Sequence, residues 1–325
     1  MKAAVYRRYG QPEVIQLEDH PTPAPGDDEV LIRTRAVAIN PMDYHLMGGT
    51  MVLRLMTGPH RPQPTRPGAD LAGEVEAIGR NVTRFQVGDA VFGVARGAFA
   101  EYACAKESHL ALKPANATFE QAAAVPVAGL TALQGLRNKG CIQPGQRILI
   151  TGAAGGVGTF AVQLAKAFGA EVTGVCGTRS VDLVRSLGAD HVIDYGRDDF
   201  TRSAQKYDLL LDCAGNRSLW ACRRVMTSNG TFVGVGARPG GRWLGPLPHV
   251  LNVFVSGGFV SQRVILFVAA VNVSDLIVMT ELIEAGKVTP VIDSSYTLSE
   301  VAAAVRHLRD GHARGKVIIA VQPGR

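Results

Sequence analysis

Apolar and polar residues alternate in short runs over the first 115 residues and take a helical spacing afterwards. The early runs, such as residues 29–40 and 71–79, are separated by clusters of proline and glycine, the pattern of short strands joined by turns. We therefore predict a β-rich, barrel-like segment there. From about Phe119 apolar β-runs alternate with helical stretches, which is typical of a parallel sheet with crossover helices.

The repeating β-runs are plainest at residues 147–152, 171–177, 207–215 and 231–236. The last apolar run, residues 316–321, has no partner in this series, so we predict that it returns to the β-rich segment. A chain of 325 residues is also too long for one ordinary core. The predicted domains are a discontinuous β-rich domain, residues 1–118 and 290–325, and an α/β domain, residues 119–289.

A glycine-rich segment joins the first of these strands to a long helix. Gly152, Gly155, Gly156 and Gly158 lie in ITGAAGGVG, residues 150–158. Glycine lets the backbone approach a pyrophosphate closely, and a helix N-terminus offers N–H groups and a favourable dipole. The segment predicts a dinucleotide-binding site, although a tight turn from strand to helix would use the same residues.

The end of the next strand indicates which dinucleotide is bound. NAD enzymes usually carry an acidic residue there for the ribose hydroxyls. This chain instead has Gly177, Thr178, Arg179 and Ser180, and a guanidinium with two hydroxyls can bind a 2′-phosphate. NADPH is therefore the predicted cofactor.

Charge and hydropathy exclude two classes of partner. The formal net charge of +6 would suit a nucleic acid, but the basic residues are scattered and not interleaved with aromatic ones. The N-terminus has no apolar signal-like stretch, and the most apolar run, residues 264–273, is shorter than the ~20 residues of a membrane span. We expect a cytoplasmic protein without a nucleic-acid or membrane partner.

The chain resembles the zinc-independent quinone oxidoreductases of the medium-chain dehydrogenase/reductase superfamily over essentially its full length. This resemblance implies an α/β fold: a GroES-like catalytic domain plus an alcohol dehydrogenase-like Rossmann domain with a doubly wound parallel sheet. The matching motifs are AINPMDY (38–44), the stretch 67–93, GLTAL (129–133), ITGAAGGVG (150–158), GTRS (177–180), GADHVIDY (188–195) and ARGKVII (313–319).

The resemblance also implies roles for single residues. Asn40 and Thr131 would flank the nicotinamide, and together with Tyr44 they are the catalytic candidates. Tyr44 is either a proton donor or a packed, hydrogen-bonded tyrosine, and Asp43 beside it reads as a turn or helix cap. The implied cofactor-binding residues are Asn40, Thr131, Gly152, Ala154, Gly155, Gly156, Val157, Gly177, Thr178, Arg179, Ser180, Tyr195, Ala214, Gly215, Val235, Gly236, Phe259, Val260 and Lys316.

No metal is expected. Zinc-dependent members of the superfamily hold the metal through a cysteine and a His-Glu pair, at positions that are here Asn40, Ala69 and Asp70. His45 and Asp70 lack the spacing and the thiolates of a zinc site. Without this Lewis acid, the hydride must go to an acceptor that takes it readily.

The predicted function is therefore NADPH-dependent reduction of a quinone or another carbonyl-conjugated acceptor. A 2-alkenal or enone reductase acting on C=C bonds and a non-catalytic NADPH-binding regulatory protein remain alternatives. The loop 48–66, rich in Met, Leu and Pro, is expected to line an apolar substrate pocket. The resemblance further implies a homodimer through an edge of the Rossmann sheet, formed by residues 232–237 and the apolar run near Val264.

Overall fold

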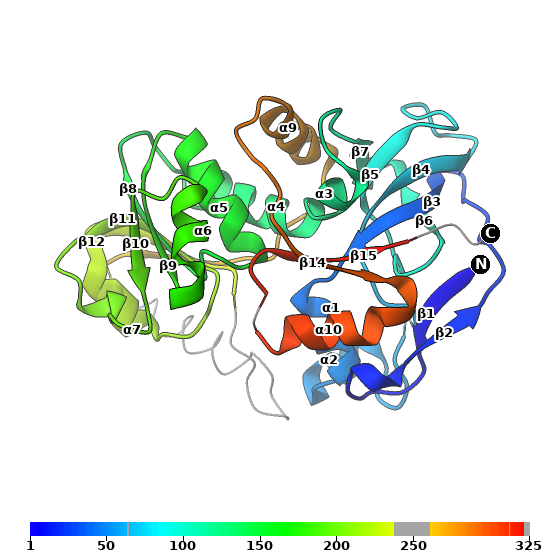
Figure 1. Cartoon of the computed structure of the whole chain (residues 1–325), viewed down its shortest axis with the longest axis horizontal. Coiled ribbons are helices and arrows are strands. Elements are labelled where there is room, and N and C mark those ends of the chain that lie inside the picture. Colours follow the sequence, from blue (N-terminus) through cyan, green and yellow to red (C-terminus); the bar gives the residue numbers. More distant parts are fainter. Residues whose placement is uncertain (64, 237–260, 312, 322–325) are drawn as a thin grey trace. The chain divides into compact units, whose positions relative to one another are not determined.

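The computed structural model describes residues 1–63, 65–236, 261–311 and 313–321 (Figure 1). It divides into two compact units, the first comprising Met1–Leu130 and Ala270–Arg325 and the second Thr131–Ala269. The first unit is discontinuous, but the divisions differ from those predicted at 118/119 and 289/290. The reason is packing: helix α3 (Phe119–Ala123) contacts strands β3 and β4 of the first unit, and α9 (Val273–Glu284) contacts β7.

The first unit is built on a seven-stranded sheet of order β14-β15-β3-β4-β5-β7, with β6 paired to β3, and a separate β1-β2 pair. Strand β15 pairs antiparallel with β3, which confirms that the last apolar run returns to the β-rich segment. The strands are β1 (Lys2–Tyr6), β2 (Ile15–Asp19), β3 (Glu29–Ala38), β4 (Asp70–Ile78), β5 (Ala90–Val94), β6 (Tyr102–Lys106), β7 (Leu110–Leu112), β14 (Ile292–Thr297) and β15 (Lys316–Ala320).

One apolar core holds this unit together. Val37 of β3, Leu71 of β4 and Ile319 of β15 are fully buried in it, and Val305 of helix α10 packs on the same cluster. The core therefore fixes the ends of β3, β4 and β15. The other helical segments of the unit are η1 (Pro12–Val14), α1 (Pro41–Gly48), α2 (Met51–Thr57), η2 (Glu107–His109), α4 (Pro126–Leu133), which crosses the division, η7 (Leu298–Glu300) and α10 (Val301–Arg309).

The expected loop over residues 48–66 contains a helix, so that prediction is wrong in part. Gly49 has a φ of +58°, a left-handed conformation that ends α1. The next stretch, Met51–Thr57, has neither glycine nor proline and forms α2.

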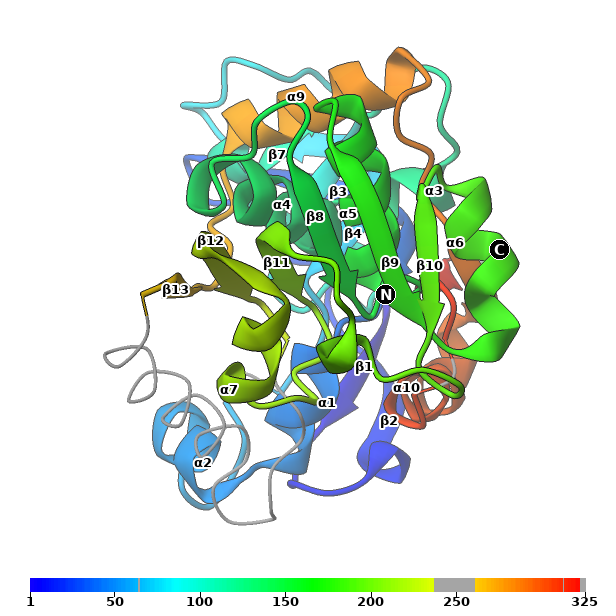
Figure 2. The same cartoon turned by 90° about the vertical axis from the view of Figure 1, so that its left-hand side faces the viewer.

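The second unit contains a six-stranded sheet of order β10-β9-β8-β11-β12-β13, in which every pair of neighbours is parallel (Figure 2). Helices α5 and α6 cover one face and α7 the other, as right-handed crossovers require and as Figures 1 and 2 show. The doubly wound sheet is confirmed. Its strands are β8 (Arg147–Thr151), β9 (Glu171–Cys176), β10 (His191–Asp194), β11 (Tyr207–Asp212), β12 (Met226–Gly234) and β13 (Arg263–Leu266).

The order reverses beside β8, the point at which open α/β sheets bind ligands at the carboxyl ends of their strands. Leu149, Leu210 and Phe232, from the three central strands β8, β11 and β12, are buried in a common core that fixes those ends. The helical segments of this unit are η3 (a π-helix, Gln134–Lys139), α5 (Gly156–Ala167), η4 (Thr178–Ser180), α6 (Val181–Ser186), η5 (Phe200–Arg202), α7 (Leu219–Cys222) and η6 (Arg223–Val225).

Among the described residues, no helix is both long enough and apolar enough to cross a membrane.

Candidate functional site

The glycine-rich segment lies at the carboxyl edge of the second-unit sheet, between β8 and α5. Gly152 has a φ of +62°, which favours glycine. A Cβ on Gly158 would lie 2.1 Å from the Gly152 carbonyl oxygen and 2.7 Å from the Cα of Ala153. The turn and the packing of the helix on the loop both require glycine here.

This loop presents its backbone, not side chains, at the edge of the sheet. Gly155, Gly156 and Val157 are partly exposed, whereas the Ala154 methyl group is buried. The first N–H groups of an α-helix have no intrahelical acceptor, so the start of α5 offers donors and the positive end of the helix dipole. The segment therefore fits the pyrophosphate of a dinucleotide.

Thr151 and Asp212 tie this edge together, and sequence reasoning missed both. The Thr151 hydroxyl donates to Asp212 Oδ1 at 2.5 Å, and the N–H groups of Ala214 and Gly215 donate to the same oxygen at 3.2 and 2.9 Å. Asp212 is only 2% exposed. The carboxylate thus holds Ala214 and Gly215 beside the end of β8. The sequence signal that could have identified Asp212 is an acidic residue at the end of an apolar β-run.

Val235 and Gly236 join the same edge. Their N–H groups both donate to the Asp212 carbonyl oxygen at 3.0 Å. A Cβ on Gly236 would lie 2.2 Å from the Cys213 carbonyl oxygen, so the chain passes too closely for any side chain. The predicted cofactor residues after β8, β11 and β12 are therefore brought together. The predicted residues Phe259 and Val260 lie outside the described residues.

Two of the residues predicted to bind the 2′-phosphate region, Gly177 and Tyr195, lie next to each other. Gly177 follows β9 and Tyr195 follows β10, and these strands are neighbours with Asp194 opposite Cys176. A Cβ on Gly177 would lie 2.9 Å from the Tyr195 hydroxyl oxygen, so the tyrosine lies against this backbone. Tyr195 is 60% exposed, which leaves one of its surfaces open to a ligand.

A carboxylate from the neighbouring strand also lies at this edge: Asp194, the last residue of β10, is hydrogen-bonded there. Thr178 donates a side-chain hydrogen bond to Asp194 and lowers the pKa of its carboxyl group, and the Gly196 N–H donates at 2.9 Å. The Asp194 charge is offset by Arg197, whose Nε lies 3.6 Å from Oδ2. With Arg179 included, the side chains carry two positive charges against one negative, which still suits a phosphate.

A second polar group lies inside the first unit. Asn40, Asp43, Asp70 and Lys316, here called the buried polar cluster, are all less than 8% exposed. The hydrogen-bonded pairs among them are far apart in the sequence: Asn40 and Asp70 by 30 residues, and Asn40 and Lys316 by 276. Sheet order explains their meeting: Asp70 begins β4, Lys316 begins β15, and Asn40 follows β3, which lies between them.

Lys316 is the centre of the buried polar cluster. Its ammonium donates to Asn40 Oδ1 at 2.6 Å, to Asp70 Oδ2 at 3.2 Å and to the Ile39 carbonyl oxygen at 3.2 Å. These bonds use all three of its N–H donors. Lys316 therefore orients the Asn40 side chain. That Lys316 also lines the dinucleotide stays a prediction, and a direct contact would require one of these three bonds to break.

Asn40 and Asp70 are oriented by the same network. The Asn40 amide N–H donates to Asp70 Oδ2 at 2.9 Å, which fixes which way the amide points. The other oxygen of Asp70 accepts the Val127 N–H at 3.0 Å, so the carboxylate also caps the start of α4. That helix carries Thr131. Thr131 belongs to the second unit and Asn40 to the first, so their meeting at the nicotinamide stays a prediction.

Burial dominates the titration of both acids. It raises the pKa of Asp70, an effect opposed by Lys316 and by the hydrogen bond from Asn40. Burial also raises the pKa of Asp43 to about 7, helped by the negative charge of Asp70 and opposed by the Asn40 backbone N–H. That N–H donates to Asp43 Oδ2 at 2.8 Å, which confirms Asp43 as a helix cap, at the start of α1.

Tyr44, the other catalytic candidate, lies on α1 next to the buried polar cluster. It is partly buried against the core of the first unit, and burial raises the pKa of its hydroxyl. Its ring contacts that of His45, with centroids 4.4 Å apart. Its role in proton transfer stays a prediction.

The side chains around Asp70 do not fit a catalytic zinc. They supply an ammonium and an amide, whereas zinc prefers thiolates, imidazoles and free carboxylates. Within the described ranges, no three His, Cys, Asp or Glu side chains are grouped so that they could hold a metal.

Comparison with known proteins gives a consistent result. The family model "Alcohol dehydrogenase GroES-like domain" matches residues 26–115, and "Zinc-binding dehydrogenase" matches residues 187–319. The chain is 35% identical over 335 residues to the "Chloroplast envelope quinone oxidoreductase homolog" of Arabidopsis thaliana, with 98% of each chain covered. It is also 35% identical to the "NADPH-dependent alkenal/one oxidoreductase, chloroplastic" of the same plant, covering 98% of this chain and 79% of the relative.

Solved structures agree. The quinone oxidoreductase of Coxiella burnetii superposes with a TM-score of 0.87 at 30% identity, with 99% of each chain covered.

Replacing Asp43 by Asn should flatten the pH dependence of stability. The pKa of Asp43 is raised from 3.8 to about 7 on folding, so the folded state holds an extra proton in this interval. This stabilisation is complete at acidic pH and is lost as the pH rises through about 7, with a slope of up to ~1.4 kcal/mol per pH unit. Urea unfolding from pH 4 to 8 should show this slope in the wild type but not in D43N. If D43N and the exposed control D28N both keep it, the assignment to Asp43 fails.

Replacing Lys316 by Met should lower the free energy of unfolding by about 3–5 kcal/mol, because the buried Asp70 would lose its counter-charge. Adding Asp70→Asn to this variant should recover part of the loss. The control Lys2→Met removes an exposed ion pair and should change little. Denaturant unfolding measures all three, and a K316M protein as stable as the wild type would contradict the role of the ammonium.

Proposed function

Because the chain belongs to the quinone oxidoreductase family of the medium-chain dehydrogenase/reductase superfamily, we propose that it transfers a hydride from NADPH to a quinone or another carbonyl-conjugated acceptor without zinc. The chain is an oxidoreductase. The observation that carries the proposal is the glycine-dependent loop before α5, at the switch point of the parallel sheet.

NADPH would be held by residues at the carboxyl edge of the second-unit sheet. The start of α5 would bind the pyrophosphate, and Arg179 with Thr178, Ser180 and Tyr195 would bind the 2′-phosphate. The relative named as an NADPH-dependent alkenal/one oxidoreductase supports this cofactor. When bound, NADPH supplies the hydride from its nicotinamide ring.

The buried polar cluster would fix the substrate side of the reaction. Asn40 has its amide oriented by Lys316 and Asp70, so it would present a constant geometry to the nicotinamide without a metal. Tyr44, beside Asp43 of this cluster on α1, would donate the proton of its hydroxyl to the reduced acceptor. Since no Lewis acid polarises the carbonyl, only acceptors with a conjugated system would react quickly.

A second acceptor class has specific support. The alkenal/one oxidoreductase matches this chain over 98% of its length, so reduction of the C=C bond of an enone is the alternative to quinone reduction. Both reactions would use the same residues and differ only in the acceptor.

Purified protein should oxidise NADPH with a quinone or an enone after treatment with a chelator. The faster of the two acceptor panels would name the acceptor class, and simple aldehydes should react slowly. NADPH binding without turnover on either panel would contradict the proposal, and loss of activity on chelation that zinc restores would contradict the zinc-free part of it.

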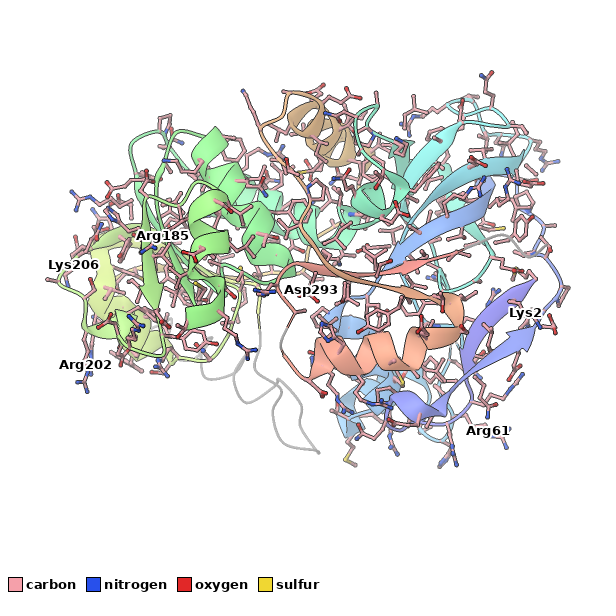
Figure 3. The ribbon with its side chains drawn as sticks, viewed as in Figure 1. Lys2, Arg61, Arg185, Arg202, Lys206 and Asp293 are labelled. Atoms are coloured by element: carbon pink, nitrogen blue, oxygen red, sulfur yellow. The ribbon has the colours of Figure 1, made fainter. Side chains whose placement is uncertain are left out.

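Replacing Arg179 by Gln should weaken NADPH binding at least tenfold and leave NADH binding unchanged, because only NADPH carries the 2′-phosphate. Arg185 on α6 of the same unit is exposed and pairs with Asp182 at 3.7 Å, so R185Q is a matched control (Figure 3). Titration of cofactor fluorescence measures both constants. Equal loss of NADPH and NADH binding in R179Q would show that the guanidinium does not select the phosphate.

The dimer and the cytoplasmic location stay predictions. Among the described strands, β13, which contains Val264, forms the end of the second-unit sheet and leaves an edge for a second copy. Sedimentation of the purified protein measures its oligomeric state directly.

A further inference from the structure

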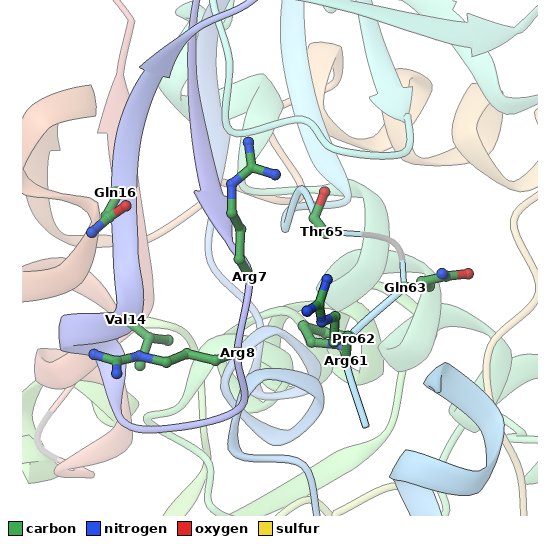
Figure 4. A pocket seen from close by; sticks show the side chains of 8 residues that line it. All are labelled: Arg7, Arg8, Val14, Gln16, Arg61, Pro62, Gln63 and Thr65. Atoms are coloured by element: carbon green, nitrogen blue, oxygen red, sulfur yellow. The ribbon is translucent and has the colours of Figure 1, made fainter. Parts of the chain in front are cut away.

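The first unit carries a surface pocket of about 530 Å³ to which the proposed reaction assigns no step. Part of its lining comes from the loop 48–66, but Arg61, Gln63 and Thr65 make that part polar and not apolar as expected of the substrate pocket. It is lined by Arg7, Arg8, Val14 and Gln16 around the β1-β2 hairpin and by a second segment, residues 61–63 and 65 (Figure 4). The second segment contributes Arg61, Pro62, Gln63 and Thr65. A pocket of this volume is in the range of small-molecule sites.

Hydrogen bonds hold the two segments together. The Tyr6 N–H donates to the Thr65 carbonyl oxygen at 2.8 Å, at the end of β1. The Tyr9 hydroxyl lies 2.8 Å from Thr57 Oγ1 and donates to the Gly58 carbonyl oxygen at 2.6 Å. These hydrogen bonds, most of them to backbone atoms, therefore fix the position of the two lining segments relative to each other.

The positive charge of the pocket is only partly compensated. Three guanidinium groups line it and no carboxylate does. Glu18 pairs with Arg7 at 2.7 Å and offsets one charge. Within the described part of the chain, the side chains of Arg8 and Arg61 have neither a hydrogen bond nor an ion pair, in contrast to exposed Arg80, which pairs with Asp27 at 2.7 Å. With Glu18 counted, the group keeps a net charge of +2.

We propose that this pocket binds a small organic phosphate monoester. Such a group carries between −1.5 and −2 charges at neutral pH, which matches the uncompensated charge, and guanidinium groups bind phosphate oxygens through paired N–H donors. The pocket is larger than a phosphate ion. Gln16, Gln63 and Thr65 suit the hydroxyl groups of an organic part, and Val14 and Pro62 suit its carbon skeleton.

The site is distinct from the cofactor residues. None of the lining residues is a predicted cofactor residue: the glycine-rich segment and Arg179 belong to the second unit, and Asn40 and Lys316 of the first unit do not line the pocket. A test must nevertheless fill the cofactor site first, since that site also binds phosphate groups.

Isothermal titration calorimetry of the full chain, saturated with NADP⁺ at low salt, tests the proposal. The probes are glucose 6-phosphate, glycerol 3-phosphate, inorganic phosphate, glucose and succinate. The variant R8Q/R61Q removes the two unpaired guanidinium groups, and R80Q/R202Q removes the same charge elsewhere on the surface (Figure 3 labels Arg61 and Arg202). Melting temperatures confirm that both variants fold.

The phosphate esters should bind the wild type and R80Q/R202Q equally, and R8Q/R61Q at least tenfold more weakly. Glucose should not bind, and inorganic phosphate should bind more weakly than the esters. The proposal is overturned if neither ester binds or if R8Q/R61Q binds them like the wild type. Succinate binding as tightly as the esters would overturn the phosphate assignment, and inorganic phosphate binding as tightly would overturn the organic part.

Discussion

The buried contact between Lys316 and Asp70 is the interaction on which the first unit's candidate site depends. Two opposite charges enter a core only if their hydrogen bonds are satisfied. Here the ammonium uses its three donors and the carboxylate receives a further amide and a backbone N–H. The pair therefore orients Asn40 and caps the helix that carries Thr131. Asn40, the candidate nicotinamide contact of the first unit, thus depends on one ammonium group from β15.

The second unit depends on a different constraint: backbone segments at the carboxyl edge of its sheet approach each other too closely for side chains. Gly158 and Gly236 each lie so near a carbonyl oxygen that a Cβ would clash at 2.1 to 2.2 Å. Asp212 then gathers the loops after β8 and β11 by accepting several hydrogen bonds on one oxygen. Main-chain donors at the carboxyl edge suit an anionic dinucleotide because they carry no charge that must be desolvated.

Local patterns predicted the elements better than the contacts between them. The alternation of β-runs and helices gave the parallel sheet, and the unpartnered run at 316–321 gave the return of β15. The domain divisions differed because α3 and α9 read as helices of the α/β series, and only packing shows that they contact β3, β4 and β7. Similarly, the sequence of 48–66 indicates a loop because glycines precede α2 and a proline-rich stretch follows it, which leaves only seven residues for the helix.

The same contrast between local patterns and long-range contacts holds for the candidate site. Residues in one motif, such as those of ITGAAGGVG, were identified from the sequence, and Asn40, Thr131 and Lys316 came from the family resemblance. The buried polar cluster was not foreseen as a unit, because its hydrogen bonds join residues up to 277 positions apart. Asp194 was overlooked near Thr178 for the same reason, since their contact arises from pairing of β9 with β10.

Transfer of deuterium tests the central claim most directly. Chelator-treated protein would be given NADPH carrying deuterium at the transferable C4 position and an enone acceptor, and the product would be analysed by mass spectrometry. The account predicts one deuterium on the β-carbon of the product, together with a slower rate than with unlabelled NADPH. Product without deuterium, or no product until zinc is added, would contradict metal-free hydride transfer from the cofactor.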